Sequence, residues 1–219
     1  VRDIISDEIK DGWNVVAVVS AMSKETNKLI DLAKQVGVEN LVDPEYDSLI
    51  STGEDVSSSL LAIALNSIEI SSRSWRGWQI PIITDSFHSN AKIEEIKANQ
   101  IINSFKEGVK VAVVSGFQGI EQAGRITTLG RGGSDTSAVA IAATIDAERC
   151  DIYTDVSGIY TTDPRVKRNA SKLKKISFEE MLEMASLGAN VLQTRAVELA
   201  MRHKVPIRVL NSFLKEEGT

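Results

Sequence analysis

Cysteine and histidine are scarce in this 219-residue sequence, which has one Cys and two His residues. The single cysteine, Cys150, excludes an internal disulfide and fits a reducing compartment. No metal-ligand cluster is visible, and the two histidines, His88 and His203, are expected at the surface or at helix ends, so no metal site is expected. The longest apolar runs, such as VVAVV, are too short to cross a bilayer, and no signal peptide is visible. These absences favour a cytoplasmic protein that does not enter a membrane.

An excess of positive charge is lacking as well. Lys and Arg number 25 against 30 Asp and Glu, which gives a net charge of −5, and no basic block stands out. Nucleic acid is therefore not an expected partner. Hydrophobic residues make up 42% of the chain, which is enough for a sizeable core in one domain, or in one domain with two lobes.

Strand-like and helix-like patterns alternate along the chain. β-Branched or apolar runs predict strands at residues 14–20, 78–84, 110–117, 150–155 and 206–210, and the first of these is continuous, as in a strand buried on both faces. Helical spacing of apolar residues predicts helices at 27–36, 56–68, 93–108, 134–147, 177–188 and 190–204. Ser177 and Glu180 form a capping-box pattern, and Gly188 is placed to end that helix. This alternation predicts an α/β protein with a largely parallel sheet, in which binding sites gather at the carboxyl ends of strands.

The stretch TTLGRGGSD, at residues 127–135, combines three glycines with two charged residues. Gly130, Gly132 and Gly133 permit positive φ angles and a close approach of the backbone to a ligand. Ser134 stands at the expected N-cap of the alanine-rich helix that follows, so backbone N–H groups and the helix dipole would face the loop. This arrangement predicts a site for an anion such as a phosphate.

Two charged side chains flank these glycines. Arg131 offers a planar guanidinium that suits a carboxylate or a phosphate. Asp135 either favours the helix N-terminus through its charge or orients groups around a reacting centre. The pattern is neither a Walker A loop, which needs a lysine where Ser134 stands, nor G-x-G-x-x-G. Taken alone, the stretch also fits a surface loop whose glycines serve only turns.

A second cluster lies in YTDVSGIYTTDPR, at residues 153–165. Thr154 and Asp155 fall at the carboxyl end of a predicted strand, Tyr160 offers an aromatic face, and Arg165 suits a phosphate. A turn and hairpin between two strands would account for the same residues, and the two interpretations are compatible.

Two smaller clusters precede these. Glu54, in STGEDVSSSLL, lies at the start of a predicted helix, where an acidic residue also serves as a simple favourable charge. Ser20 and Thr26, in VVSAMSKET, lie just beyond the first predicted strand. Hydroxyl groups in such places bind ligands, but they are also common loop residues.

Taken together, the motifs resemble aspartate kinase, a member of the amino-acid kinase family. The matching segments follow the family's order over nearly the whole chain: VVSAMSKETNKLI, LISTGEDVSSSLLA, GWQIPIITDSFHSNAKI, VVSGFQGIEQAGRITTLGRGGSDTSAVAIAA, CDIYTDVSGIYTTDPR and FEEMLEMASLGANVLQTRAVELA. The spacing of GRGGSD and TDVSGIYTTDPR is highly specific. The resemblance implies one catalytic domain over residues 1–219, with a three-layer αβα fold around a largely parallel central sheet.

The resemblance also implies a reaction and its partners. ATP, with Mg²⁺ held mainly by the nucleotide phosphates, would phosphorylate the side-chain carboxylate of L-aspartate to 4-phospho-L-aspartate, the first step toward lysine or diaminopimelate, threonine and methionine. By the same resemblance, Arg131 would hold the substrate α-carboxylate and Glu54 would lie near its α-amino group. Ser20, Thr26 and Phe117 would line the aspartate pocket.

The remaining roles concern the phosphates and the nucleotide. Arg131, Ser134 and Asp135 are the catalytic residues that the resemblance implies, with Asp135 organising the phosphate-binding groups. The residues implied for the nucleotide are Gly130, Gly132, Gly133, Ser134, Thr154, Asp155, Tyr160, Arg165 and Asn190.

The sequence departs from the family pattern in places that bear positive charge. Members begin with a strand and a K-[FY]-G-G-[TS]-S loop whose lysine contacts the phosphates, whereas this chain opens on Ile4, Ile5 and Ile9 at helical spacing. A second lysine, usual in a G-A-K-V-L segment, is replaced by Asn190. We therefore expect the first strand to be missing and the chain to have weak or no turnover. The ACT domains common in the family are not found either, so any homodimer is expected to form through the kinase domain.

Three alternatives stay open at this point. Another kinase of the same fold would act on glutamate, acetylglutamate, carbamate or UMP, although Glu54 with Arg131 favours a substrate that has both a free amine and an α-carboxylate. A degenerate paralogue would bind a nucleotide or an amino acid without turnover, which Asn190 favours. A purely structural α/β domain would use its glycines only for turns.

Overall fold

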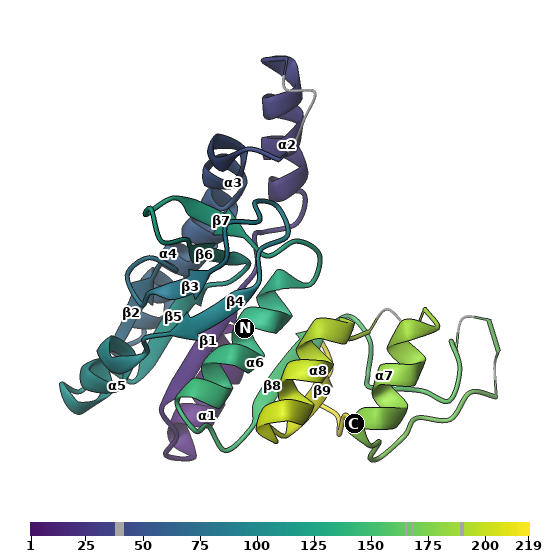
Figure 1. Ribbon diagram of the computed structural model, residues 1–219. Coiled ribbons are helices and arrows are strands. Elements are labelled where there is room, and N and C mark those ends of the chain that lie inside the picture. The colour runs from purple at the N-terminus through teal and green to yellow at the C-terminus, as the bar shows by residue number, and fades with distance from the viewer. Residues whose placement is uncertain (38–41, 165, 168, 189–190) are drawn as a thin grey trace. The chain divides into compact units, whose positions relative to one another are not determined.

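The computed structural model describes residues 1–37, 42–164, 166–167, 169–188 and 191–219 (Figure 1). The predicted site residues Arg165 and Asn190 therefore lie outside the described residues. The chain divides into two compact units, Val1–Ile141 and Ala142–Thr219. Each unit is described by itself.

A parallel sheet forms the centre of the first unit, with the strand order β1 (Val15–Val19), β5 (Val111–Ser115) and β2 (Ser72–Trp75). All five residues of β5 are buried, because it is the middle strand. The predicted strand at 14–20 is confirmed as β1, but the prediction that it is buried on both faces is wrong. β1 is only half-buried because, among the described strands, it pairs with a neighbour on one side.

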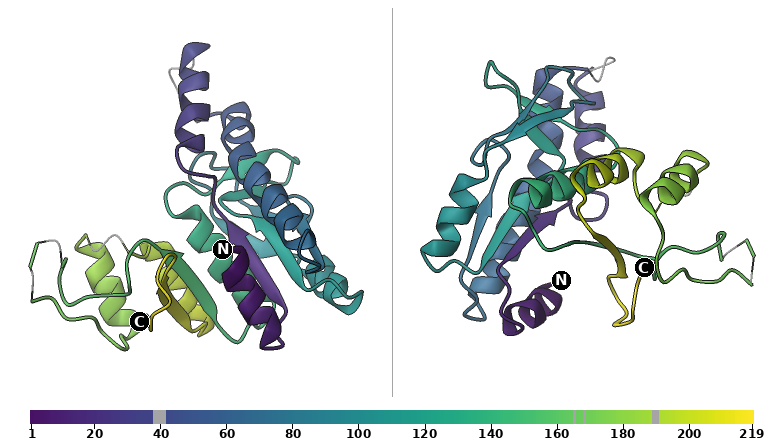
Figure 2. Two further views of the ribbon diagram at one scale, coloured as in Figure 1. Left: turned by 180° about the vertical axis from the view of Figure 1, so that it is seen from behind. Right: turned by 60° about the horizontal axis from the view of Figure 1, so that its bottom comes forward.

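Two helices cover one face of this sheet, namely α1 (Arg2–Lys10) and α4 (Thr52–Asn66), which lie together along it in Figure 2. Val111 and Val113 of β5 form a buried cluster with Leu65 and Ala62 of α4 and with Ile5 of α1. Burial of each Val, Leu or Ile side chain in this cluster contributes about 1.5–3 kcal/mol. This packing holds the carboxyl-terminal half of α4 against the strands.

A second, mixed sheet completes the strands of this unit, in the order β4 (Ile93–Ile96), β3 (Ile82–Thr84), β6 (Gln118–Ile120) and β7 (Ile126–Thr128). The β3–β6 pair is parallel, whereas β4–β3 and β6–β7 are antiparallel. The strand predicted at 78–84 is confirmed only as β3. A turn occupies the residues before it, where the Ile82 N–H donates to the carbonyl oxygen of Gly77 at 2.9 Å.

The helix predicted over 93–108 is wrong in its first part. Residues Ile93–Ile96 form β4, and α5 occupies only Asn99–Lys106. Ile93 and Ile96 have helical spacing, but pairing with Ile82 to Thr84 of β3 satisfies their backbone groups instead. Tertiary pairing has overridden the local pattern, as is common for short strands.

Two neighbouring helices, α2 (Glu25–Gln35) and α3 (Pro44–Ile50), stand side by side at the top of Figure 1, and α3 also contacts β7. The sequence interpretation missed α3. Its start has a recognisable signal, because Asp43 is the N-cap, its side chain accepts a 2.7 Å hydrogen bond from the Glu45 N–H, and Pro44 is the first helical residue.

The second unit contains a parallel pair of strands, β8 (Cys150–Thr154) and β9 (Ile207–Asn211), with α7 (Phe178–Ser186) and α8 (Thr194–His203). The predicted capping box is confirmed. The Glu180 N–H donates to Ser177 Oγ at 3.2 Å, and the Ser177 N–H donates to Glu180 Oε2 at 3.0 Å. The chain is thus an α/β protein with parallel sheets and one mixed sheet, in agreement with the predicted class.

Candidate functional site

The glycine-rich stretch forms a tight loop between β7 and α6 (Gly133–Thr144). Gly130 and Gly132 have φ angles of +73° and +68°, which confirms the predicted positive φ at these two positions. Gly133 needs no positive φ, but a Cβ there would lie 2.9 Å from the side chains of Leu129 and Phe117. The three glycines therefore serve two purposes, backbone direction and close packing.

Ser134 is not the N-cap of α6 that the sequence suggested. The Gly132 carbonyl oxygen already accepts a hydrogen bond from the Thr136 N–H at 3.1 Å, and the helix begins at Gly133. A glycine at positive φ can turn the chain into the helix before Ser134 is reached. Ser134 instead packs against the end of β5, since a Cβ on Gly116 would lie 2.9 Å from Ser134 Oγ.

The carboxyl ends of β1 and β5 meet at this point. The Gly116 N–H donates to the carbonyl oxygen of Val19 at 3.0 Å, and a Cβ on Gly116 would also lie 3.0 Å from Val18. Ser20 follows directly and is exposed. The structure therefore brings Ser20 and Ser134 to the same end of the parallel sheet, as the predicted topology requires.

Glu54 lies in the first turn of α4 and is only 3% exposed. Its Oε1 accepts a 3.0 Å hydrogen bond from the Ala21 N–H, which follows Ser20. Its Oε2 is buried without a hydrogen-bond partner among the described residues. Burial raises the pKa of Glu54 to about 7, and the nearby charge of Asp55 adds to this, while the Ala21 N–H acts against it. The predicted helix-start position is confirmed, but capping does not account for a carboxylate turned into the interior.

Phe117 follows β5 with a φ angle of +66°, which is unusual for a residue with a side chain. Two hydrogen bonds hold this conformation, one from the Phe117 N–H to Ser137 Oγ at 3.2 Å and one from the Leu129 N–H to the Phe117 carbonyl oxygen at 2.9 Å. Its ring packs with residues of α2 and α3. Thr26, half-buried, lies in the first turn of α2.

The two charged residues of the loop differ in environment. Arg131 is exposed at the turn before α6, whereas Asp135 is half-buried in the first turn of that helix. Burial raises the pKa of Asp135. An exposed guanidinium next to a glycine-bounded turn is well placed to meet an anionic group from solvent.

A hydrogen-bond network that the sequence interpretation missed supports these residues. Asp55, next to Glu54, accepts hydrogen bonds from Ser115 Oγ at 2.8 Å and from Gln118 Nε2 at 3.1 Å, and Arg76 Nε lies 3.9 Å from it. The Gly77 N–H donates to Gln118 Oε1 at 3.2 Å. No residue pattern in the sequence signals this, because the partners are up to 63 positions apart.

The predicted nucleotide residues that are described lie in the second unit. Thr154 ends β8, and its hydroxyl donates to Asp155 Oδ1 at 3.1 Å, which confirms that both lie at the carboxyl end of a strand. Tyr160 pairs with Lys172 in an isolated antiparallel bridge. The alternative of a hairpin between two strands is not confirmed, because β8 pairs in parallel with β9 and the Tyr160–Lys172 bridge lies outside the named strands.

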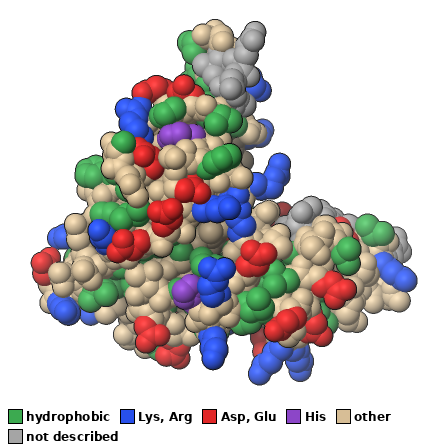
Figure 3. All heavy atoms as spheres, in the orientation of Figure 1, with side chains coloured by type: hydrophobic (Ala, Val, Ile, Leu, Met, Phe, Trp, Pro, Cys, Tyr) green, Lys and Arg blue, Asp and Glu red, His purple; other side chains and the backbone are tan. Residues whose placement is uncertain are grey.

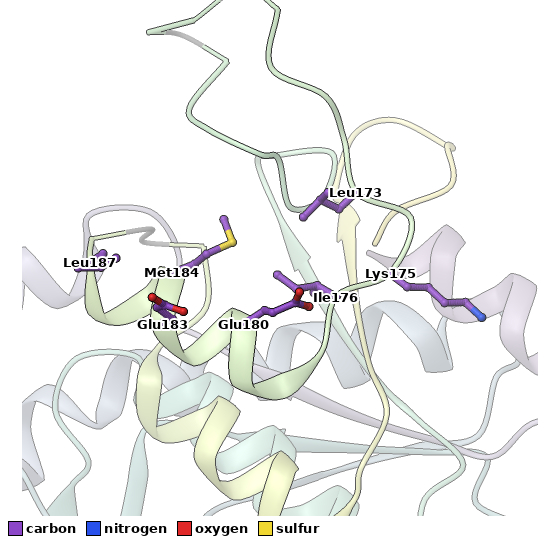
Figure 4. Close-up of a pocket in the computed structure, with 7 residues that line it drawn as sticks. All are labelled: Leu173, Lys175, Ile176, Glu180, Glu183, Met184 and Leu187. Carbon is purple, nitrogen blue, oxygen red and sulfur yellow. The ribbon is translucent and has the colours of Figure 1, made fainter.

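A shallow pocket of about 370 Å³ lies in the same unit (Figure 4). Glu180, Glu183 and Met184 of α7 and the C-cap residue Leu187 line one side, and Leu173, Lys175 and Ile176 come from the segment before this helix. None of the predicted site residues lines it. The pocket therefore gives no support to the predicted chemistry.

The face shown in Figure 3 has acidic and basic side chains interspersed rather than separated by sign. Among the described residues, no group of three or more His, Cys, Asp or Glu side chains could hold a metal ion. None of the helices in the described ranges has the length and apolar character needed to cross a bilayer.

Three comparisons with known proteins identify similar sequences and folds. The family model described as the amino acid kinase family matches residues 1–211. An aspartate kinase of Stutzerimonas stutzeri is 56% identical over 208 residues, which cover 95% of this chain and 50% of that protein. Similar relatives are covered to the same extent, so the chain spans about half the length of the curated relatives it matches.

Two solved structures are similar over most of the chain. The crystal structure of an aspartate kinase from Synechocystis has a TM-score of 0.85 at 45% identity, covering 100% of this chain and 36% of that one. The structure of E. coli aspartokinase III in complex with aspartate and ADP has a TM-score of 0.77 at 34% identity, covering 88% of this chain and 44% of that one.

Proposed function

Since the chain belongs to the amino acid kinase family, we propose that residues 1–219 are the catalytic domain of an aspartate kinase. The reaction transfers the γ-phosphoryl group of ATP to the side-chain carboxylate of L-aspartate and yields 4-phospho-L-aspartate and ADP. This is the first step toward lysine or diaminopimelate, threonine and methionine. The relatives of high identity are aspartate kinases, and the E. coli relative was solved with aspartate and ADP.

The buried carboxylate of Glu54 is the observation that carries this proposal. A polar atom that is buried without a partner is costly, and its cost is removed when a ligand supplies the missing donor. An α-ammonium group donates hydrogen bonds and also favours the ionised form of Glu54. Glu54 Oε2 is therefore proposed to hold the substrate amine, and the guanidinium of Arg131 is proposed to hold the α-carboxylate.

The other residues of the first unit take complementary roles in the proposal. Ser20, Thr26 and Phe117 line the aspartate pocket near the ends of β1 and β5. Ser134 and the backbone of the glycine-rich loop approach the transferring phosphate, since glycines allow the closest backbone contact. Asp135 organises the groups that bind the phosphates.

The nucleotide is proposed to bind to the second group of residues, namely Thr154, Asp155, Tyr160, Arg165 and Asn190. Mg²⁺ would be held mainly by the nucleotide phosphates, and it would supply charge neutralisation. Coordination by phosphate oxygens does not require a cluster of protein carboxylates, and the described residues contain no group of three or more His, Cys, Asp or Glu that could hold a metal ion.

The chemical step does not require a general base from the protein. An aspartate side chain is ionised at neutral pH, so its oxygen can attack the γ-phosphorus without a general base. The new O–P bond forms while the bond to the bridging oxygen of ADP breaks, and ADP leaves with that electron pair. Positioning and charge neutralisation therefore account for catalysis.

The test is a substrate panel with coupled ADP detection. L-Aspartate, L-glutamate, N-acetyl-L-glutamate and UMP are compared, and weak turnover is expected with L-aspartate alone. Arg131→Ala should raise the KM for aspartate about 10- to 100-fold, as expected for a charge-assisted hydrogen bond, while Arg125→Ala, a matched exposed arginine, should not. Faster turnover of another member of the panel would contradict the aspartate assignment.

A second candidate, a non-catalytic paralogue that binds nucleotide or amino acid, is favoured by Asn190 at the position of a usual lysine. Calorimetric binding of ADP–Mg²⁺ and aspartate without any turnover would support it. A cytoplasmic location and a homodimer formed through the kinase domain stay predictions, which cell fractionation and sedimentation velocity can check.

A further inference from the structure

The carboxylate of Asp47, in α3, is completely buried. Both of its oxygens accept hydrogen bonds from Thr128 at the end of β7. Thr128 Oγ1 donates to Oδ1 at 2.7 Å, and the Thr128 N–H donates to Oδ2 at 2.9 Å. Because the Asp47 carboxylate binds both the backbone and the side chain of Thr128, it fixes the position and the direction of the end of β7.

The same carboxylate also holds a second segment. The Ser89 N–H donates to Oδ2 at 2.9 Å, Ser89 Oγ lies 3.2 Å from Oδ1, and His88 Nδ1 lies 2.9 Å from Oδ2. Ser89 is the donor in both of its bonds, whereas the roles of His88 Nδ1 and Asp47 Oδ2 depend on the tautomer of the imidazole. Asp47 thus ties α3 to residues 88–89 and to the end of β7 at once.

The glycine-rich loop follows the end of β7 and packs against residues 89–91. The Ala91 N–H donates to the Thr128 carbonyl oxygen at 2.9 Å. A Cβ on Gly130, two residues after Thr128, would lie 2.9 Å from Asn90 Oδ1 and 3.0 Å from the Ser89 carbonyl oxygen. The position of Gly130, and with it the direction of the following Arg131, therefore depends on the segment that Asp47 holds.

We propose that Asp47 is a positioning residue for the kinase reaction: it acts through Thr128 and Ser89 to fix the start of the glycine-rich loop. The inference rests on the proposed function of that loop. No contact of Asp47 with a substrate is involved. Its effect arises because a loop that is displaced by about 1 Å can lose about 100-fold in rate.

The experiment compares Asp47→Asn and Thr128→Val with a control, Asn66→Ala. Asn66 makes two hydrogen bonds with the Ser72 backbone at the opposite end of the parallel sheet, so its loss destabilises the unit away from the loop. Asp47→Asn is expected to speed hydrogen exchange of the amides at 128–133 and to lower kcat/KM for aspartate about 100-fold. Thr128→Val keeps the backbone bond, so a smaller loss in the same direction is expected. Asn66→Ala should lower the melting temperature without either effect.

Unchanged loop exchange in Asp47→Asn, or a kinetic loss no larger than that of Asn66→Ala at equal melting temperature, would overturn the inference. Hydrogen exchange is measured without substrates. If the parent chain neither phosphorylates nor binds aspartate, the proposed function fails, and faster exchange confined to 128–133 in Asp47→Asn still supports the role of Asp47 in holding the loop.

Discussion

The Ala21 N–H donates a 3.0 Å hydrogen bond to one carboxylate oxygen of Glu54, while the other oxygen of this buried group has no partner among the described residues. The bond joins the first turn of α4 to the chain just after β1. A Cβ placed on Gly53 would lie 2.9 Å from the Ala21 Cβ, which shows how closely the two segments approach. Glu54 is therefore held rigidly and yet has one oxygen to offer to a ligand.

Glu54→Gln keeps the shape of the side chain and removes its charge. Loss of one partner from a buried charge pair costs about 2–5 kcal/mol, so the KM for aspartate should rise at least about 30-fold. The KM for ATP should change little. Glu45→Gln is a matched control, since Glu45 is exposed and pairs with Arg125. Steady-state kinetics with each substrate varied will check this, and an unchanged KM for aspartate would contradict the amine-binding role.

The raised pKa of Glu54, about 7, also predicts a pH dependence of stability. The folded state favours the protonated form, so the stabilising contribution is complete below the usual pKa near 4.5 and is lost as the pH rises to about 7. The loss amounts to about 3 kcal/mol in the free energy of unfolding. Denaturant midpoints at pH 5 and pH 7.5 should therefore differ less in Glu54→Gln than in the parent chain. Equal pH slopes in the two proteins would sink this prediction.

The same ionisation affects substrate binding in the opposite direction. Only ionised Glu54 attracts an ammonium group, so aspartate affinity should rise between about pH 6 and pH 8. Calorimetric titrations across this range will measure it. Glu54→Gln should show weak binding that does not change with pH over the same interval.

Two glycines, Gly130 in the glycine-rich loop and Gly124 between β6 and β7, allow the effect of a left-handed backbone to be measured apart from the effect of close packing. Gly130 and Gly124 have φ angles of +73° and +84°. A Cβ added to Gly130 would meet other atoms at 2.9 and 3.0 Å, whereas a Cβ added to Gly124 would meet none within 4 Å. Gly124→Ala should cost about 1–2 kcal/mol of stability from the left-handed backbone alone. Gly130→Ala should cost more and should also abolish turnover. Equal melting temperatures and activities in the two variants would show that the close approach is unimportant.

Asn190 lies outside the described residues, so its prediction rests on the family pattern alone. A lysine there adds a positive charge beside the proposed phosphate position. Removing one preorganised donor of this kind costs about 100-fold in other enzymes, so Asn190→Lys should raise kcat by up to that factor. Asn99→Lys, at the start of α5, adds the same charge elsewhere and should leave kcat unchanged. A fall in kcat for Asn190→Lys would mean that the asparagine is adapted to its place.

Several features could be predicted from local patterns because their causes are local. The β-branched run at β1, the Ser177–Glu180 capping box and the positive φ angles of Gly130 and Gly132 depend on residues only a few positions apart. The family resemblance similarly depends on short motifs in order, and the comparisons confirm it.

Other features could not be read in this way. Residues 93–96 have the spacing of a helix, but their pairing with β3 makes them a strand. Ser134 has the residue type of an N-cap, but Gly132 already accepts the first helical bond. Asp47 has an ordinary sequence context, and only the arrival of Thr128, 81 positions away, makes it a buried acceptor.

The α/β class, the glycine-rich loop and the family can be predicted from short stretches of sequence, because hydrophobic period, backbone freedom and motif order are properties of neighbouring residues. Which carboxylates are buried, which of their oxygens are paired and what holds the loop in place follow from the folded arrangement. Burial and hydrogen bonding depend on segments that meet only after folding, and they change the free energy of a charged group far more than its neighbours in sequence do.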